Sequence, residues 1–416
     1  MLLAIPTKNR TASLRRCVES LRDNAKTYGR DVEFLVSDDS NESNAATNHS
    51  ALKDLGVRFT HYDRGFKAQY AKELAAKSGI SPHITRFAIL PNILTAMGAA
   101  RNFLTLSSIG QKLVMVDDDM VCKFAPVPNR RDKIVWALGP IIGDQEEIPA
   151  EVREDELVDE DFLAQHERLL GLRGVALTIG GSVGDSGAGN AYHMLTSRGI
   201  LPRLDSPAAL ESLLVRRELF RVSPSPRIVR WPICTGMSVG LDARSPLPPF
   251  CPILRSEDVL FGLMLQNCFG RPSAYCNYAM WHTAKRSSTL KRDIANLAVP
   301  SFGDFIVQTL VCFNPQSLEE FGRVLVEASK TTGFEYFVER IIAAWREKFI
   351  VALAKRSIGL PDFLVRELKR LEEAVCSAPP YVTPSDLPVE EFRLRVRQVG
   401  ELFLAWPALF EAAKHE

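Results

Sequence analysis

Acidic side chains that directly follow apolar runs are the first sign of chemistry in this sequence. Asp117, Asp118 and Asp119 follow the run KLVMV, and Asp38 and Asp39 follow the run FLVS. Adjacent carboxylates repel one another, so a stable fold needs a cation or hydrogen-bond donors beside them. An Asp-x-Asp at a strand end presents Asp117 and Asp119 on the same side of the chain. Two such ligands plus substrate phosphates are typical of Mg²⁺ or Mn²⁺ sites, and the alternative is an exposed acidic turn or a set of helix caps.

A second acidic pair lies in the stretch LRSEDVLFGLMLQ. Ser256 has the side chain of a helix N-cap, and apolar residues recur behind it at helical spacing. Glu257 and Asp258 therefore fall in the first helical turn, where the helix dipole favours negative charge. An ionised carboxylate there can accept a proton from a hydroxyl, and the alternative is a capping acid of structural value only.

The elements that must position these residues follow from the hydrophobic pattern. The stretches LLAIPT, VEFLVSDDS, VRFTHYD and KLVMVDDD predict strands, and residues 11–28 and 66–110 predict helices. This alternation indicates an α/β fold with a Rossmann-like, mostly parallel central sheet flanked by helices. Ligands of such sheets bind at the carboxyl ends of the strands, and both acidic clusters lie at such ends.

Four stretches in this order resemble the nucleotide-sugar-dependent glycosyltransferases of the GT-A fold, especially their large inverting family, family 2. The stretches are AIPTKNR at 4–10, FLVSDDS at 34–40, GAARNFLTLSSIGQKLVMVDDD at 98–119 and LRSEDVLFG at 254–262. Each motif alone is weak, but together they are fairly specific, and the resemblance covers roughly residues 1–290.

The resemblance implies a donor-binding set, a metal set and a catalytic pair. The donor-binding set is Pro6, Thr7, Arg10, Asp38, Asp39, Arg101, Asp117, Asp118, Lys285 and Arg286. The metal set, for Mn²⁺ or Mg²⁺, is Asp117, Asp119 and His282. In the catalytic pair Asp258 acts as the general base and Glu257 contacts the acceptor or its surroundings. The stretch SDDSNES lacks the glycine that many relatives have after the paired acids, so the choice between Asp38 and Asp39 for the base stays open.

His282 lies in YAMWHTAKRSS, a stretch that becomes basic and rich in hydroxyls. The resemblance implies that such a histidine completes the metal shell and that a nearby cation, Lys285 or Arg286, meets the diphosphate. The alternative for a single histidine is a packed or surface residue.

Two unusual segments interrupt the pattern. Residues 143–162, GDQEEIPAEVREDELVDEDF, hold ten carboxylates and one arginine, a density that indicates a solvated acidic insertion or loop rather than core. The glycine-rich stretch at 179–193, IGGSVGDSGAGNAYH, lacks both the GK[ST] ending and the GxGxxG pattern of phosphate loops. We expect it to form a flexible wall of the acceptor site.

From about residue 303 the sequence changes to long amphipathic helices. We expect a transferase domain over residues 1–302 and a helical domain over residues 303–416. The helices either cover the core or also shape the acceptor site or a homodimer contact.

Composition sets the remaining limits. The chain has 416 residues, 46% of them apolar and 24% charged, with a net charge of +1, which is typical of a globular protein and argues against a general nucleic-acid binder. Its eight cysteines are scattered, with no CxxC pair and no secretory leader, which indicates reduced thiols in the cytoplasm. The apolar start MLLAIP is too short for a membrane span.

These observations predict a metal-dependent glycosyltransferase that moves a sugar from a nucleotide donor, with a UDP-sugar favoured, to an acceptor with inversion. The acceptor class stays open among glycan, peptide, lipid-linked intermediate and natural product. A retaining GT-A enzyme is the nearest alternative. A sugar nucleotidyltransferase would carry a glycine-rich phosphate loop where this chain has PTKNRTAS. A degenerate sugar-binding module would have lost one of the acidic motifs.

Overall fold

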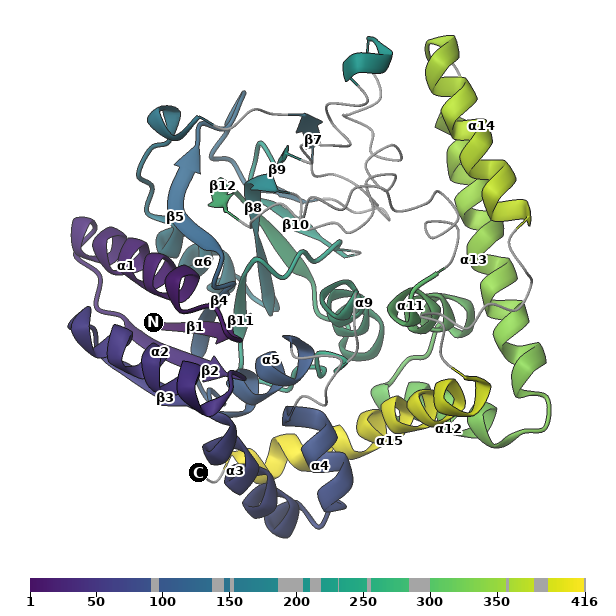
Figure 1. Cartoon of the computed structure of the whole chain (residues 1–416), viewed down its shortest axis with the longest axis horizontal. Coiled ribbons are helices and arrows are strands. Elements are labelled where there is room, and N and C mark those ends of the chain that lie inside the picture. The colour runs from purple at the N-terminus through teal and green to yellow at the C-terminus, as the bar shows by residue number, and fades with distance from the viewer. Residues whose placement is uncertain are drawn as a thin grey trace.

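The computed structural model describes residues 1–90, 97–136, 146–149, 153–185, 205–209, 218–230, 232–252, 256–283, 300–356, 359–377 and 388–414. Within these residues, a large sheet runs through the centre of the molecule and helices cover both of its faces (Figure 1). The protein therefore has the α/β architecture expected from the sequence.

The sheet has twelve strands among the described residues. They are β1 (Leu2–Thr7), β2 (Glu33–Asp38), β3 (Phe59–Tyr62), β4 (Lys112–Val116), β5 (Met120–Ala125), β6 (Val135–Trp136), β7 (Glu146–Pro149), β8 (Leu177–Asp185), β9 (Glu218–Val222), β10 (Arg227–Val229), β11 (Ser238–Asp242) and β12 (Ser273–His282). Their order is β3-β2-β1-β4-β11-β8-β12-β10-β6, with β5 on β12 and β9 between β7 and β8.

Parallel pairing is concentrated in the first half of the sheet. Strands β3, β2, β1 and β4 are parallel, and helices connect them along the chain. From β4 onward the pairing is mixed: β11 is antiparallel to both β4 and β8, whereas β8 and β12 are parallel. Antiparallel neighbours need no helical crossover, so the alternation of strands and helices predicts only the first half of the order.

Helices pack against the sheet and, in the C-terminal part, against one another. They are α1 (Thr11–Thr27), α2 (Glu42–Asp54), α3 (Arg64–Ser78), α4 (Pro82–Ile89), α5 (Met97–Leu106), α6 (Phe162–Leu170), α9 (Glu257–Phe269), α11 (Phe302–Phe313), α12 (Leu318–Lys330), α13 (Phe334–Arg356), α14 (Asp362–Ser377) and α15 (Val389–Ala413), with a short 3₁₀ turn at Glu154–Glu156.

The continuous apolar runs of the first strands are explained by burial on both faces. Leu3 and Ile5 of β1 belong to a core shared with α1, α2 and α6, whereas Leu2 and Ala4 belong to a second core shared with α3, α4, α5 and α9. A strand covered on both faces shows no alternation of apolar and polar residues. The polar residues that follow β1, β2 and β4 therefore mark the edge where the sheet leaves its helical cover.

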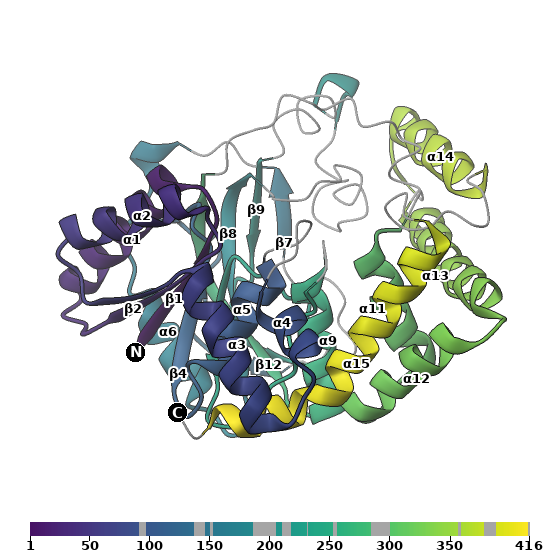
Figure 2. The same ribbon diagram turned by 60° about the horizontal axis from the view of Figure 1, so that its bottom comes forward.

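The C-terminal helices share the second core. Helix α15 packs against α12 and also against α3 and α4 (Figure 2). The indole Nε1 of Trp406 on α15 donates to the backbone oxygen of Leu247 over 2.7 Å. Helices α12 and α15 cross closely because Gly322 and Gly400 face each other, leaving no room for a Cβ at either position. Residues from α11, α12, α13 and α15 thus continue the core of the sheet.

The acidic and glycine-rich segments are only partly described. Residues 146–149 form β7, which pairs with β9, and three acids of residues 153–162 form ion pairs with basic residues outside this segment. These acids are Asp159 with Lys123, Glu160 with Arg130 and Asp161 with Arg30. The glycine-rich stretch is β8 up to Asp185, and residues 186–193 lie outside the described part. Its first half is therefore a central strand rather than a flexible wall.

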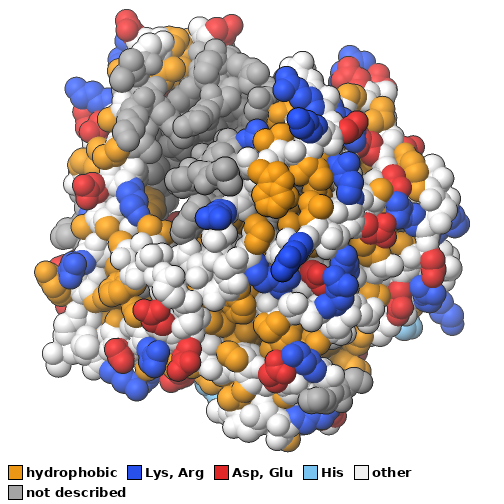
Figure 3. Space-filling view, turned by 180° about the vertical axis from the view of Figure 1, so that it is seen from behind, with side chains coloured by type: hydrophobic (Ala, Val, Ile, Leu, Met, Phe, Trp, Pro, Cys, Tyr) orange, Lys and Arg blue, Asp and Glu red, His pale blue; other side chains and the backbone are white. Residues whose placement is uncertain are grey.

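The surface and the thiols fit the composition. On the face opposite to that of Figure 1, Lys and Arg are interspersed with Asp and Glu, and a hydrophobic patch is flanked by basic side chains (Figure 3). All eight cysteines are free thiols, and five of them are buried. Among the described residues, no helix is both long and apolar enough to cross a membrane.

A buried polar network crosses the sheet beside α6. His166 places Nδ1 2.6 Å from Thr178 Oγ1 and Nε2 2.7 Å from the hydroxyl of Tyr278, which also lies 2.7 Å from Ser238 Oγ. The Tyr278 ring packs against Gly180, where a Cβ would collide with it. Burial lowers the pKa of His166 to about 3, so the imidazole is neutral in the folded protein.

This histidine makes stability depend on pH. In the unfolded chain its pKa returns to about 6.5, so below that pH the unfolded state binds a proton that the folded state does not. The contribution is present above about pH 6.5 and is lost as pH falls toward 3. Between pH 7 and pH 4.5 we expect the free energy of unfolding to fall by about 2 to 3 kcal/mol more in the wild type than in His166→Gln. Urea titrations at both pH values measure this difference, and equal losses in the two proteins would contradict it.

Candidate functional site

The first part of the site is the turn that follows β1, which meets the turn that follows β4. Thr7 Oγ1 donates to Asp118 Oδ2 over 2.6 Å. Arg10 Nη1 donates to Asp118 Oδ1 over 3.2 Å and to Asp119 Oδ2 over 2.8 Å. Asn9 has a positive φ of 55°, a conformation that asparagine tolerates better than most residues and that lets the chain turn sharply before Arg10. The parallel pairing of β1 with β4 explains why these residues meet at one edge of the sheet.

The three consecutive acids do not continue the strand. Strand β4 ends at Val116, and the backbone N–H of Met120 donates to the oxygen of Asp117 over 3.1 Å, which closes a turn. The alternation expected for a strand therefore does not apply, and the three side chains take different directions. Asp117 meets Arg101, Asp118 meets Thr7 and Arg10, and Asp119 meets Arg10 and His282.

Arg101 links this turn to helix α9. Its side chain is only 2% exposed. Arg101 Nη2 donates to Asp117 Oδ1 over 2.8 Å, and Nη1 donates to Glu257 Oε1 over 2.6 Å. Nη2 also donates to the backbone oxygen of Gly236 over 3.1 Å, and the guanidinium lies 5.6 Å from the ring centroid of Phe250. Arg101 was expected to border a nucleotide. In the structure it is a buried connection between two acidic segments.

The amino end of α9 is held by the loop before β11. Asp258 Oδ2 accepts from the backbone N–H of Gly236 over 2.6 Å, and its Oδ1 accepts from Val259 N over 2.8 Å. The expected cap by Ser256 is absent: the residue has a positive φ of 63°, and its hydroxyl donates to Asp304 Oδ1 over 3.2 Å instead of accepting from the helix. Asp258 is half-buried, whereas Glu257 is 9% exposed.

Gly236 is required by this packing. A Cβ at this position would lie 2.5 Å from Arg101 Nη2 and 2.6 Å from its Cζ. We expect Gly236→Ala to displace the guanidinium and to lower the free energy of unfolding by about 3 kcal/mol, the scale for breaking a buried ion pair. Gly333→Ala is the matched control, because a Cβ there meets nothing within 4 Å. Equal urea midpoints for the two variants would show that Arg101 is not held as described.

His282 ends β12 beside Asp119. Its Nε2 lies 3.1 Å from Asp119 Oδ1, and the following Thr283 binds the backbone oxygen of Asp119 through both its N–H and its hydroxyl, each at 2.9 Å. Arg16 of α1 in turn donates to the Thr283 hydroxyl. The end of β12 is thus fixed against the acidic turn.

A divalent cation fits part of this arrangement. Asp119 and His282 already present an oxygen and a nitrogen to each other, and a metal can replace the proton that they share. Asp117 is engaged by Arg101, and no group of three or more His, Cys, Asp and Glu side chains is arranged to hold a metal within the described ranges. Mg²⁺ and Mn²⁺ sites commonly use one or two protein carboxylates and take their other ligands from substrate phosphates and water. The donor set present is therefore compatible with such an ion once phosphates bind.

The pKa values of the acids in the cluster reflect two opposing effects: burial raises them, and the charges of Arg10 and Arg101 lower them. Burial raises the pKa of Asp118 to about 6 and that of Glu257 to about 7, where the neighbouring Asp258 charge adds to the effect. Burial also raises the pKa of Asp117, although Arg101 opposes it. Burial acts in the same sense on Asp119, but the hydrogen bond and charge of His282, with Arg10, bring its pKa below the usual value. The site thus holds closely spaced acids with different proton affinities.

The acidic pair of Asp38 and Asp39 lies next to the turn that follows β1, since the N–H of Asp39 donates to the backbone oxygen of Thr7 over 2.9 Å. Both carboxylate oxygens of Asp38 have partners within the protein. These partners are Ser40 N at 2.8 Å, Asn48 Nδ2 at 2.8 Å and His61 Nε2 at 2.9 Å. Asp39 is 1% exposed and pairs through Oδ1 with the buried Lys67, but its Oδ2 has no hydrogen-bond partner. Burial raises the pKa of Asp39 and lowers that of Lys67.

The structure brings most of the predicted site residues together. One connected cluster contains Thr7, Arg10, Arg101, Asp117, Asp118, Asp119, Glu257, Asp258 and His282. Pro6 is buried within β1, and Lys285 and Arg286 lie outside the described residues. Sequence reasoning missed Gly236, Lys67 and Thr283. A glycine before a strand, a lysine within a helical stretch and a single threonine carry no signal of their own in one sequence.

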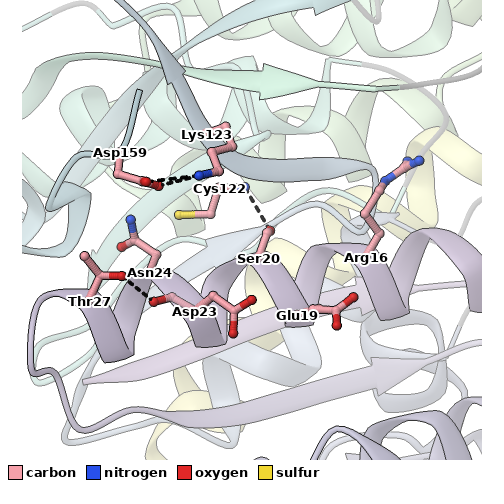
Figure 4. Close-up of a pocket in the computed structure, with 9 residues that line it drawn as sticks. All are labelled: Arg16, Glu19, Ser20, Asp23, Asn24, Thr27, Cys122, Lys123 and Asp159. Carbon is pink, nitrogen blue, oxygen red and sulfur yellow. Dashed lines mark hydrogen bonds and ion pairs between the residues drawn. The ribbon is translucent and has the colours of Figure 1, made fainter. Parts of the chain in front are cut away.

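A separate pocket of about 320 Å³ lies between α1 and β5 (Figure 4). It is lined by Arg16, Glu19, Ser20, Asp23, Asn24, Thr27, Cys122, Lys123 and Asp159. Lys123 and Asp159 form an ion pair at 2.9 Å, and Ser20 Oγ accepts from the N–H of Cys122 (Figure 4). Its lining includes none of the predicted site residues.

Comparisons with known proteins find distant structural likenesses. No protein family model matches the chain, and no curated protein matches it. Among solved structures, the chain is similar to the mannosyltransferase PcManGT from Pyrobaculum calidifontis in complex with GDP-Man and Mn²⁺. The identity is 10%, the match covers 100% of this chain and 85% of that chain, and the TM-score is 0.37. A likeness at this level carries no argument about function.

Proposed function

We propose that the protein is a metal-dependent glycosyltransferase that transfers a sugar from a nucleotide donor to an acceptor with inversion of the anomeric configuration. The observation that carries the proposal is the connected acidic cluster, in which Arg101 joins Asp117 to Glu257. The proposal is supported by the position of this cluster at the edge where α/β sheets bind ligands, because a diphosphate, a cation and a base would be neighbours there. The motifs AIPTKNR, GAARN, VDDD and SEDV, which resemble the inverting GT-A family, supply all of its residues except His282. In this proposal residues 1–302 form the transferase unit and residues 303–416 its helical cover.

The cation, Mn²⁺ or Mg²⁺, would be held by Asp119 and His282, with Asp117 as a further ligand if it leaves Arg101. When bound, it would stabilise the negative charge that develops on a departing diphosphate. Arg10 is the exposed cation of the cluster, and it already binds two carboxylates at the same edge. We propose that Arg10 turns from these carboxylates to the donor phosphates.

Asp258 is proposed as the base. Glu257 is largely buried and engaged by Arg101, whereas Asp258 is half-buried and fixed by two backbone N–H groups. Each carboxylate oxygen has a second lone pair, so Asp258 can still accept a proton from an acceptor hydroxyl. In a single displacement the acceptor oxygen attacks the anomeric carbon while the bond to the diphosphate breaks, and the acceptor proton moves to Asp258.

Asp39 is the better candidate for recognising the nucleobase. Both oxygens of Asp38 are used within the protein, whereas Asp39 Oδ2 is buried without a partner. A buried unpaired acceptor costs free energy that a ligand N–H can recover. Uracil offers one such N–H and guanine offers an adjacent pair, so the proposal accommodates a UDP-sugar or a GDP-sugar.

Calorimetric binding of UDP and GDP, with and without Mn²⁺, tests the proposal. We expect one nucleotide to bind in the micromolar range and Mn²⁺ to strengthen its binding by at least about tenfold, as expected for a cation that joins protein and diphosphate. Asp39→Asn should reduce the preference between the two nucleotides, and Glu42→Gln on α2 is an exposed acidic control. Failure of both nucleotides to bind in the presence of Mn²⁺ would refute the proposal.

A further inference from the structure

A second pocket, of about 370 Å³, lies at the sheet edge formed by β6 and β10. Its lining residues are Trp136, Ile228, Val229, Arg230, Gln266, Gly270 and Pro272. They come from β6, from β10 and the residue after it, from the carboxyl end of α9 and from the loop that leads to β12. The volume is within the range of small-molecule sites in proteins, about 300 to 1,000 Å³.

This pocket and the acidic cluster lie at opposite ends of two elements, β12 and α9. Trp136 is level with Ile228, and Ile228 is level with Ala274 near the start of β12, whereas His282 ends the same strand. At the strand rise of about 3.3 Å per residue, the pocket and His282 are roughly 25 Å apart. Helix α9 likewise begins at the acidic cluster and ends at the pocket.

Three side chains at the pocket are exposed or lack a hydrogen-bond partner among the residues that the structure describes. Trp136 is 60% exposed on a strand of two residues, an unusual place for the largest apolar side chain. Arg230 is exposed and makes no ion pair or hydrogen bond with the residues that the structure describes. The side-chain oxygen of Gln266 is buried and has no hydrogen-bond partner. Rotation about the soft terminal torsion of Gln266 can turn its amide toward the pocket.

Their chemistry favours one class of ligand. An apolar ligand would leave Arg230 and Gln266 unpaired, and a simple anion could accept from both side chains but would leave the indole face of Trp136 uncovered. A hydroxyl group both donates and accepts, so a polyhydroxylated ring can satisfy both side chains. The C–H face of such a ring can also cover the indole of Trp136, which combines an apolar face with a polar edge.

We propose that this pocket binds a carbohydrate chain at a distance from the acidic cluster. The inference rests on the proposed function, because it identifies the acceptor as a glycan long enough to reach both sites. Trp136 packs against one sugar ring while Arg230 and Gln266 bind its hydroxyls. The pocket thereby increases the affinity for long acceptors without taking part in the reaction.

Direct binding tests this site without any donor. The probes are the linear hexasaccharides of mannose, of glucose and of N-acetylglucosamine, titrated into the full chain in a calorimeter. We expect saturable binding of at least one of them, weakened about tenfold or more by Trp136→Ala and several-fold by Arg230→Gln. Val135→Ala is the matched control, because Val135 is the exposed neighbour of Trp136 on β6 but does not line the pocket. Thermal melting of each variant verifies that it is folded.

Absence of binding by all three hexasaccharides, or equal affinity of the wild type and Trp136→Ala, overturns the proposal. A wild-type dimer that dissociates in Trp136→Ala on sedimentation also overturns it, since the pocket would then serve self-association. Nucleotide binding in the same samples separates the two proposals. If a hexasaccharide binds but no nucleotide does, the carbohydrate pocket is supported and the proposed glycosyltransferase function is refuted.

Discussion

Asp258→Asn lowers the rate of sugar transfer by roughly 10²-fold or more, the scale of general-base catalysis, if the carboxylate removes the acceptor proton. The amide that replaces it cannot accept a proton in this way, although it keeps nearly the same shape. Affinity for the donor changes little, since Asp258 binds the backbone of Gly236 and Val259 rather than the turn at 117–119. Initial rates at saturating donor, together with donor affinity from calorimetry, measure the two effects separately.

The control for this variant is an acid in the first turn of another helix. Glu42 occupies the first turn of α2 and is exposed, so Glu42→Gln removes a helix-terminal charge without touching the site. Its rate should equal that of the wild type. A wild-type rate in Asp258→Asn would instead make this carboxylate a structural link between α9 and the loop at Gly236.

We expect Asp119→Asn to remove the proposed metal dependence of donor binding. Asp119 is the acid that lies beside His282, and it is therefore the carboxylate placed to share a cation with that imidazole. In the wild type Mn²⁺ should strengthen nucleotide diphosphate binding about tenfold or more. In the variant the affinities with and without Mn²⁺ should differ by less than about twofold, because one of few protein ligands is lost.

Asp159→Asn serves as the surface control, since Asp159 pairs with Lys123 in the separate pocket beside α1. It should retain the full effect of Mn²⁺. Undiminished stimulation by Mn²⁺ in Asp119→Asn would remove Asp119 from the metal set and leave its pairing with Arg10 and His282 as a structural feature.

The parts of the fold that follow from local pattern could be predicted. Strands β1, β2, β3 and β4 and the helices after β1 and after β3 follow from apolar runs and helical periodicity, whereas α2 was not predicted. The meeting of Thr7, Asp38 and the turn at 117–119 follows from parallel pairing. The long C-terminal helices were equally evident. The mixed order beyond β4 was not, because an apolar strand does not specify the direction of its neighbours.

Details of the site depended on contacts between distant segments. The strand ends at Val116, and the turn at Asp117 redirects the three acids. No spacing rule predicts such a turn within a run of like charges. The pairing of Arg101 with both Asp117 and Glu257 joins positions that are far apart in sequence. The same is true of Lys67 with Asp39. These contacts exist only after the helices pack on the sheet, so a single sequence carries no trace of them.

The central claim is transfer of a sugar from a nucleotide donor. Its most direct test is incubation of the full chain with UDP-glucose or GDP-mannose and Mn²⁺, with a mixture of oligosaccharide acceptors, followed by quantification of the released nucleoside diphosphate and of the product's anomeric configuration. The account predicts release that requires Mn²⁺, falls by roughly 10²-fold in Asp258→Asn, and yields an inverted linkage. Retention of configuration would contradict single displacement. Absence of donor cleavage, or formation of a nucleotide sugar and pyrophosphate from a sugar phosphate and a nucleoside triphosphate, would contradict the assignment as a glycosyltransferase.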